Sequence, residues 1–236
     1  MIEPNLFFHN SFEVTKEKIY ILSSNDNYAS NFGKQWKKYK NIQIDSINNF
    51  DISKNFLEEV LFNDLKILKN KNVLEIGCGA GRFTEHIVKY AKLCVSVDLS
   101  SSIFYNVAKN SKNLLLIKSD LMDLLPNKKF DIVICRGVLQ HTPNPLKSII
   151  KLYDFIDNYG KVYFDIYPMP KIGFLPNISR IVSIAPPSGS GSPGPLERKI
   201  PSGPSARTSV AETEPGTIVT RKPQLTRCRG IFHFIP

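Results

Sequence analysis

The sequence predicts an α/β protein with a doubly wound, mostly parallel sheet. Short apolar segments alternate with helical segments through the middle of the chain, a pattern typical of parallel strands joined by helical crossovers. The second observation is a glycine-rich turn that directly follows the first apolar segment. Strands are readable at 73–76 and 93–98, within 114–121, and at 130–135 and 161–167.

Helical patterns precede and separate these strands. Helices are expected over 55–69, 82–90, 100–110 and 144–157. In the first of them, apolar residues recur at helical spacing. The last begins with an Asn-Pro pair, an N-cap followed by proline at the first helical position, and we expect it to stop near Gly160.

The turn after the first strand carries three glycines at alternate positions, Gly77, Gly79 and Gly81. Glycine permits positive φ and has no Cβ, so a ligand can lie against the backbone. The spacing differs from the G-x-G-x-x-G fingerprint of dinucleotide-binding folds, and the P-loop ending is absent. Glu75 beside this turn is costly to bury without a partner. We expect the partner to be a cationic or hydrogen-donating end of a ligand, with a lysine as the alternative.

Acidic residues follow the next two strands. Asp98 ends the strand 93–98, and Asp120 lies just past the third strand. In a doubly wound sheet the carboxyl ends of the strands border the ligand crevice, where an acid can accept both hydroxyls of a ribose. Two other roles stay open: Asp98 as the N-cap of the helix 100–110, and Asp120 as a turn residue only.

These motifs resemble those of the class I S-adenosylmethionine-dependent methyltransferases that act on small molecules. The E-x-G-x-G-x-G pattern from Glu75 to Gly81 is similar to their first motif, and the segment 136–145, RGVLQHTPNP, is similar to their loop after strand four. The resemblance covers 73–145. It implies a Rossmann-like sheet of seven strands, of which the last two are antiparallel; we find no sequence signal for those two.

The resemblance implies S-adenosyl-L-methionine as cofactor and a small molecule as methyl acceptor. It places the methionine part on Glu75 and the glycine backbone, the ribose on Asp98, and the adenine beside Asp120 and Leu121. The expected cofactor-binding residues are Glu75, Gly77, Cys78, Gly79, Gly81, Asp98, Leu99, Asp120, Leu121 and Arg136. The transfer needs no metal, because the sulfonium is already an activated methyl donor.

His141 is the candidate catalytic residue. Its unperturbed pKa near 6.5 suits a general base around neutral pH, although it can equally fix the loop by hydrogen bonding. Two other function classes stay open. An inactive, cofactor-binding methyltransferase-like protein fits the two missing strands, and an NAD-dependent oxidoreductase is disfavoured by the glycine spacing.

The chain is expected to have three parts. Residues 1–50 form an N-terminal cap segment whose F-G-x-Q-W pattern resembles a segment that covers the cleft in a subset of these methyltransferases; the alternative is that Trp36 and Tyr39 pack it onto the core. Residues 51–184 form the cofactor-binding core. Residues 185–236 are rich in Pro, Gly and Ser, and we expect them to be disordered or non-native, with a genuine linker as the alternative. The strand 161–167 would then be an exposed sheet edge, and the protein marginal and aggregation-prone.

Composition limits the partners. The net charge of +10 comes from scattered lysines without an aromatic-rich RNA-binding motif, so a nucleic-acid partner is not expected. The four cysteines form no C-x-x-C pair, which disfavours a disulfide framework or a zinc site and fits a cytoplasmic protein. The sequence has no signal-peptide pattern and no apolar run long enough for a membrane span. The acceptor and the oligomeric state stay open.

Overall fold

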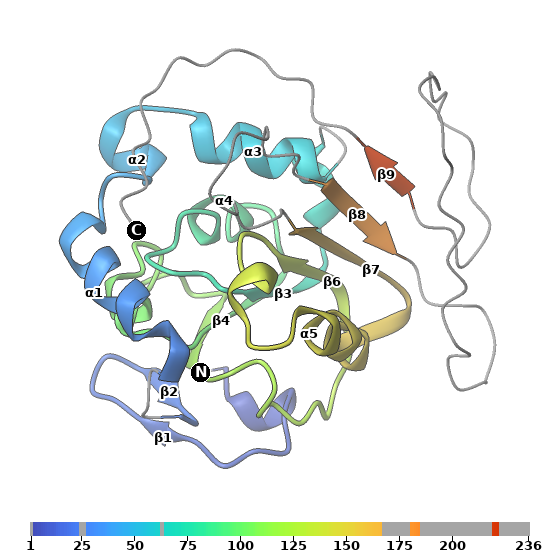
Figure 1. Cartoon of the computed structure of the whole chain (residues 1–236), viewed down its shortest axis with the longest axis horizontal. Helices are drawn as coiled ribbons and strands as arrows, with labels where there is room; N and C mark the ends of the chain where they lie inside the picture. Colours follow the sequence, from blue (N-terminus) through green and yellow to red (C-terminus); the bar gives the residue numbers. More distant parts are fainter. Residues whose placement is uncertain (1, 24–26, 62–63, 167–179, 185–218, 222–236) are drawn as a thin grey trace.

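The structure, a computed structural model, describes residues 2–23, 27–61, 64–166, 180–184 and 219–221. Its centre is a mixed sheet with the order β1-β2-β5-β4-β3-β6-β7-β8-β9 (Figure 1). The central strands are β3 (Asn72–Ile76), β4 (Leu93–Asp98), β5 (Leu114–Lys118), β6 (Phe130–Cys135) and β7 (Ile156–Ile166). All four pairings between them are parallel. The predicted doubly wound α/β fold is therefore confirmed.

The far edge of the sheet corrects the expectation that the last two strands are missing. β8 (Arg180–Ile184) pairs antiparallel with β7, and β9 (Val219–Arg221) pairs antiparallel with β8. Isoleucine and valine dominate β8, and such β-branched residues favour strands. The strand is short and adjoins a change in composition, which hid it in the sequence. Hence β7 is not an exposed edge. The expectation of disorder over 185–236 otherwise lies outside the described residues.

The N-terminal edge also extends the sheet. β2 (Ile19–Ile21) runs parallel to β5, and β1 (Glu13–Val14) lies antiparallel to β2. Ile19 and Tyr20 are buried, which accounts for the pairing of so short a segment. The sequence analysis identified no strand among residues 1–50, so the structure adds these two.

The helices are shorter than the sequence pattern suggested. The α-helices are α1 (Ser30–Tyr39), α2 (Asp45–Asn48), α3 (Ile52–Val60), α4 (Thr84–Ile87) and α5 (Pro145–Leu152). Short 3-10 segments are η1 (Pro4–Leu6), η2 (Asn27–Ala29), η3 (Leu65–Leu68), η4 (Ser101–Tyr105), η5 (Leu139–His141) and η6 (Tyr153–Phe155). Thus the helix expected over 55–69 divides into α3 and η3, and those expected over 82–90 and 100–110 shrink to α4 and η4.

Gly160 does not end a helix, because it lies inside β7. A Cβ on Gly160 would stand 2.9 Å from the backbone oxygens of Phe130 and Asp131, so the residue permits a close approach of β7 to β6. The ladder between these two strands has a register shift at the same place, between Phe130 and Ile132. The structural role of this glycine is therefore in the sheet.

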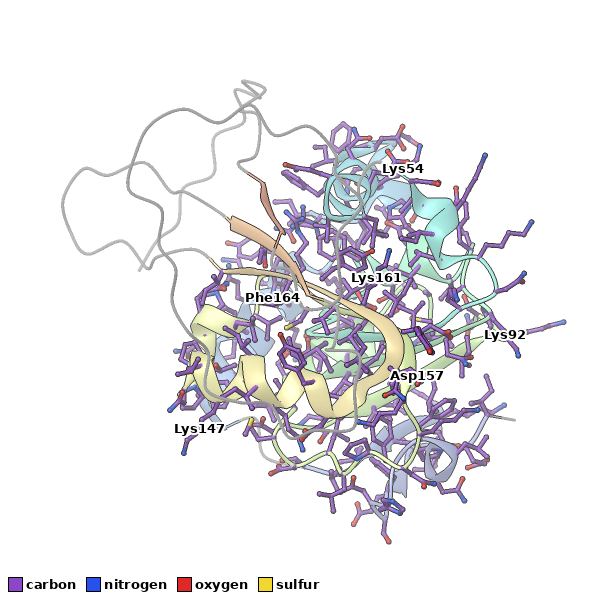
Figure 2. All side chains as sticks on the ribbon, turned by 90° about the vertical axis from the view of Figure 1, so that its right-hand side faces the viewer. Lys54, Lys92, Lys147, Asp157, Lys161 and Phe164 are labelled. Atoms are coloured by element: carbon purple, nitrogen blue, oxygen red, sulfur yellow. The ribbon has the colours of Figure 1, made fainter. Side chains whose placement is uncertain are left out.

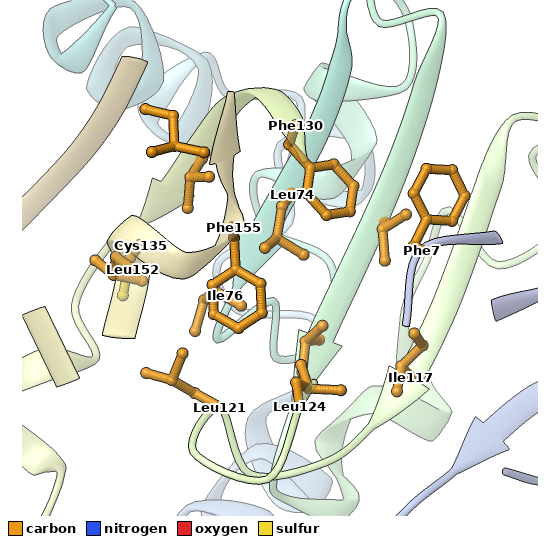
Figure 3. Close-up of a cluster of buried hydrophobic side chains, with 14 of the residues drawn as sticks. Phe7, Leu74, Ile76, Ile117, Leu121, Leu124, Phe130, Cys135, Leu152 and Phe155 are labelled. Atoms are coloured by element: carbon orange, nitrogen blue, oxygen red, sulfur yellow. The ribbon is translucent and has the colours of Figure 1, made fainter. Parts of the chain in front are cut away.

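Apolar side chains fill both faces of the sheet. Leu74 and Ile76 of β3 face one side, where Phe130, Leu152 and Phe155 join them (Figure 3). On the opposite face, the intervening residues of the strands pack against α3 and α4: Val73, Cys94 and Ile132 meet Leu57 and Ile87. Alternation along each strand thus places helices on both faces and leaves the strand ends for the site.

Lysines occur on several separate parts of the surface. In Figure 2 the labelled lysines Lys54, Lys92, Lys147 and Lys161 come from different parts of the fold: α3, the turn before β4, α5 and β7. Within the part of the chain that the structure describes, no helix is long and apolar enough to cross a membrane.

Candidate functional site

A cavity of about 320 Å³ lies at the carboxyl ends of four adjacent parallel strands. Its walls include the turn after β3, the end of β4, the segment after β5 and the loop after β6. The chain runs from β3 to β4 and β5 on one side and then crosses to β6 on the other. Such a reversal of strand order is where doubly wound sheets bind ligands.

The glycine turn forms one wall of this cavity, and its three glycines do different work. Gly77 has φ +78°, and a Cβ there would stand 2.0 Å from Cγ2 of Val138. At Gly81, with φ +94°, a Cβ would stand 2.5 Å from Oδ1 of Asn106. Gly79 instead has open space where its side chain would be, with nothing nearer than 4.0 Å. Gly77, Cys78 and Gly79 line the cavity, whereas Gly81 is a packing glycine behind it.

Asp98 lies at the cavity wall beside this turn. Its Oδ2 accepts a hydrogen bond from the backbone N–H of Gly79 over 2.7 Å, and its Oδ1 accepts from the N–H and hydroxyl of Ser100 at 2.8 and 2.6 Å. Burial raises the pKa of Asp98, and the bonds from Ser100 and Gly79 counter part of that rise. The alternative cap role falls to Ser100, whose hydroxyl accepts from the N–H of Ser102 in η4.

Glu75 lies behind the turn rather than in the cavity. Its Oε2 accepts hydrogen bonds from the hydroxyls of Thr84 at 2.7 Å and Ser96 at 2.6 Å. Its Oε1 has no hydrogen-bond partner among the described residues, and burial raises the pKa of the carboxyl to about 7. Among the described residues the hydrogen-bond partners of Glu75 are hydroxyls and not a lysine, and its expected contact with a ligand stays a prediction. Glu75 ties the glycine turn to α4 and β4.

The segment after β5 supplies Ser119 and Leu121 to the cavity, whereas Asp120 does not line it. Oδ1 of Asp120 accepts from the N–H of Met122, which is the turn role considered above. The hydroxyl of Tyr28 hydrogen-bonds to the Asp120 carboxylate, and burial together with that carboxylate raises the pKa of Tyr28. Tyr28 lines the cavity, where the sequence had led us to expect Asp120.

The loop after β6 brings Arg136 and His141 to the cavity. Asp165 of β7 fixes the start of this loop: its Oδ1 accepts from the N–H of Gly137, and its Oδ2 lies 3.6 Å from Nε of Arg136. Sequence reasoning missed Asp165 because it is distant along the chain. The available signal was an acid that interrupts the apolar run 162–166.

His141 packs edge-on against Phe32, with 4.8 Å between the ring centroids. Burial lowers the pKa of His141, which keeps the imidazole neutral near pH 7. A neutral ring at the cavity suits a general base, and the contact with Phe32 suits a structural role. Both readings therefore persist.

Comparison with known proteins identifies the domain. Residues 74–164, which run from β3 into β7, match the family model described as "Methyltransferase domain". The chain carries a class I S-adenosylmethionine-dependent methyltransferase domain. The resemblance drawn from the motifs at 75–81 and 136–145 is confirmed.

Relatives of this methyltransferase domain have varied names. The chain is 34% identical over 103 residues to a ubiquinone biosynthesis O-methyltransferase of Coxiella burnetii, covering 41% of this chain and 44% of that protein. It is 31% identical over 147 residues to a tRNA U34 carboxymethyltransferase of Campylobacter fetus, covering 53% and 51%. The chain thus spans about half the length of the curated relatives it matches.

A solved structure shares the fold. The phosphoethanolamine N-methyltransferase 1 of Haemonchus contortus, solved with phosphoethanolamine and S-adenosylhomocysteine, superposes with a TM-score of 0.50 at 20% identity, covering 64% of this chain and 34% of that one. At this identity the likeness concerns the fold alone.

The N-terminal segment covers the cavity of the methyltransferase domain. Phe32 and Trp36 of α1 line it, together with Gln43 beyond that helix. Tyr39 is 43% exposed and does not line the cavity. Trp36 therefore does more than pack the segment onto the core. The division of the chain at 50 and 184 stays a prediction.

Arg82 of the methyltransferase domain was also missed. It follows the third glycine and lines the cavity, where its Nε donates to Oγ of Ser53 over 3.0 Å and its NH1 donates to Oε1 of Gln43 over 3.2 Å. A charged residue directly after the glycine turn was the available signal. Arg82 links the turn to the N-terminal segment.

Proposed function

We propose that this protein transfers a methyl group from S-adenosyl-L-methionine to a small-molecule acceptor. The observation that carries the proposal is the bond between Asp98 and Gly79, which places a carboxylate and bare backbone side by side in the cavity of a methyltransferase domain. A carboxylate can accept from two ribose hydroxyls, while the open space at Gly79 lets a chain of ligand atoms lie on the backbone.

The residues present fit this cofactor. We assign the methionine part to the backbone of Gly77, Cys78 and Gly79, and the ribose to Asp98 and Leu99. The adenine falls beside Leu121 and Tyr28, and Asp120 acts on it through the Tyr28 hydroxyl. Glu75 and Gly81, first assigned to the cofactor, support the turn from behind.

The protein's own contribution is positioning. Bound S-adenosylmethionine supplies an electrophilic methyl group, and the acceptor atom must approach it in line. Holding two reactants in that geometry can lower the barrier by about 7 to 11 kcal/mol. Phe32, Trp36 and Val138 bring apolar surface to the cavity and limit water there. His141 is the residue we propose to take the acceptor's proton.

Two measurements test this function. Calorimetry should show binding of S-adenosylmethionine and S-adenosylhomocysteine and none of NAD. Incubation with tritium-labelled S-adenosylmethionine and a panel of small acceptors should then transfer label. Cofactor binding without transfer to any acceptor would favour the inactive, cofactor-binding alternative, and binding of NAD alone would overturn the proposal.

The remaining partners are proposals of the same kind. RNA binding that weakens steeply with salt would contradict a small-molecule acceptor, because phosphate contacts make affinity salt-dependent. We propose the cytoplasm as the compartment, supported by the buried free thiols of Cys78, Cys94 and Cys135. Cell fractionation that places the protein outside the cytoplasm would contradict this.

A further inference from the structure

Two arginines lie together at the cavity. The guanidinium of Arg82 stands 5.2 Å from the ring centroid of Phe56 and 4.8 Å from that of Phe83. The guanidinium of Arg136 stands 5.4 and 5.8 Å from the same two centroids. Both cations thus share one aromatic platform, and both line the cavity. Like charges this close repel each other unless an anion lies between or beside them.

Among the described residues, only one of the two arginines has an ion pair. Arg136 has Asp165 at 3.6 Å, whereas Arg82 has no ion pair within 4.0 Å and bonds only to the neutral Ser53 hydroxyl and Gln43 amide. More distant carboxylates also act on the pair: against the effect of burial, the charges of Asp45 and Asp165 raise the pKa of Arg82, and those of Asp165 and Glu59 raise the pKa of Arg136. The Asp45 carboxylate is held by other donors, because it accepts from the N–H groups of Ser53 and Lys54 and contacts His86, so it makes no direct bond to Arg82.

The pKa of Arg82 reflects its burial and the unfavourable interaction between the two cations. Burial and the charge of Arg136 lower the pKa of Arg82 to about 10, still well above neutral pH, so both side chains stay charged. A partly buried cation without an ion pair is unfavourable, and a charge-assisted bond to an oxyanion would stabilise it. Arginine suits this task because its planar fork matches the geometry of carboxylate and phosphate.

The cofactor does not neutralise the positive charge of the cavity. The charged side chains that line the described cavity are Lys40, Arg82 and Arg136 against Asp98. S-adenosylmethionine brings a sulfonium and an ammonium against a single carboxylate, so it enters as a net cation. The second substrate is therefore the group left to balance the remaining positive charge.

Building on the proposed function, we propose that the methyl acceptor is an anion, a small molecule with a carboxylate or phosphate group that Arg82 and Arg136 bind together. This assigns the charge of Arg136 to the acceptor rather than to the cofactor. The platform of Phe56 and Phe83 holds both guanidiniums in place, and Asp165 orients that of Arg136.

The test uses the whole chain saturated with S-adenosylhomocysteine. Trp36 is the only tryptophan and lines the cavity, so its fluorescence reports binding there. The probes are benzoate and phenyl phosphate, with benzamide as the uncharged match. We compare the wild type with Arg82→Gln, Arg82→Lys and Ser53→Ala, the last of which removes a bond of Arg82 but keeps its charge.

We expect the wild type saturated with S-adenosylhomocysteine to bind each anion at least about tenfold more tightly than benzamide. Such a difference corresponds to one charge-assisted hydrogen bond. Arg82→Gln should abolish this preference, while Arg82→Lys and Ser53→Ala should retain most of it. Affinity for S-adenosylhomocysteine should change less than about threefold in all three variants, which also shows that they fold.

Two results would contradict this proposal without contradicting the proposed function. One is that the wild type, saturated with S-adenosylhomocysteine, binds benzoate and benzamide with equal affinity. The other is an Arg82→Gln variant that binds S-adenosylhomocysteine about tenfold more weakly yet binds methylthioadenosine normally, since the arginine would then hold the cofactor's own carboxylate. A wild type that binds no S-adenosylhomocysteine would instead contradict the proposed function as a whole.

Discussion

The carboxylate of Asp98 accepts a hydrogen bond from the backbone N–H of Gly79 over 2.7 Å, which joins the end of β4 to the turn after β3. The two strands are parallel neighbours, with Ile76 opposite Val97, so the register of the sheet brings this acid and this turn together. Most of the proposed function follows from that contact.

Asp98→Asn should weaken binding of S-adenosylhomocysteine by about tenfold to a hundredfold, because hydrogen bonds to a charged acceptor contribute about 1.5 to 3 kcal/mol. Isothermal titration calorimetry measures the change. Ser102→Ala is the matched control, since its hydroxyl lies 3.4 Å from the same carboxylate but Ser102 does not line the cavity. Equal affinities of Asp98→Asn and wild type would refute the ribose assignment.

Gly77→Ala and Gly137→Ala form a pair that separates packing from backbone strain. Both residues have positive φ, but a Cβ at Gly137 has nothing within 4 Å, whereas one at Gly77 collides with Val138. We expect Gly137→Ala to lower the free energy of unfolding by about 1 to 2 kcal/mol and Gly77→Ala by roughly 3 kcal/mol or more. Urea denaturation measures both. Equal losses would mean that Val138 does not pack on the turn.

Glu75 should make stability depend on pH. Burial raises its pKa to about 7, so the folded protein holds this proton more tightly than the unfolded chain does. The stabilisation is complete at low pH and is lost as the pH rises toward and through about 7. Between about pH 5 and pH 8 we expect the wild type to lose roughly 2 to 3 kcal/mol relative to Glu75→Gln, measured by urea denaturation at both values. A constant difference between the two proteins would rule out the buried, protonated carboxyl.

His141→Ala should lower turnover by about a hundredfold and leave the affinity for S-adenosylhomocysteine nearly intact, as expected for a general base. Since burial lowers the pKa of His141, the wild-type rate should stay level down to below pH 6.5, about its usual value, and then fall. Rates with the acceptor found by label transfer and calorimetry of each variant provide the comparison, with His141→Gln as control. Parallel loss of turnover and cofactor affinity would assign His141 to the loop structure instead.

The central strands were predictable because continuous apolar runs are typical of strands buried on both faces. β2, β8 and β9 were missed because three to five residues form a strand only when a neighbouring strand is available, which no local pattern shows. The expected helix lengths were wrong where the apolar spacing continues past the end of a helix, as it does beyond Ile87, the last residue of α4.

The site was predictable where it follows strand ends. Asp98 and the turn at 77–79 depend on local order along the chain, and the sheet register does the rest. Tyr28 and Asp165 reach the site from distant segments and carry no local motif. The hydrogen bonds of Glu75 with Thr84 and Ser96 were not foreseen, because no local motif pairs these residues.

A crystal structure of the protein with S-adenosylhomocysteine tests the central claim most directly. The proposed function predicts the ribose hydroxyls within hydrogen-bonding distance of the Asp98 carboxylate and the homocysteine part along the backbone of Gly77 to Gly79. A ligand bound outside this cavity, or one whose ribose lies at Arg82 and Arg136, would contradict it.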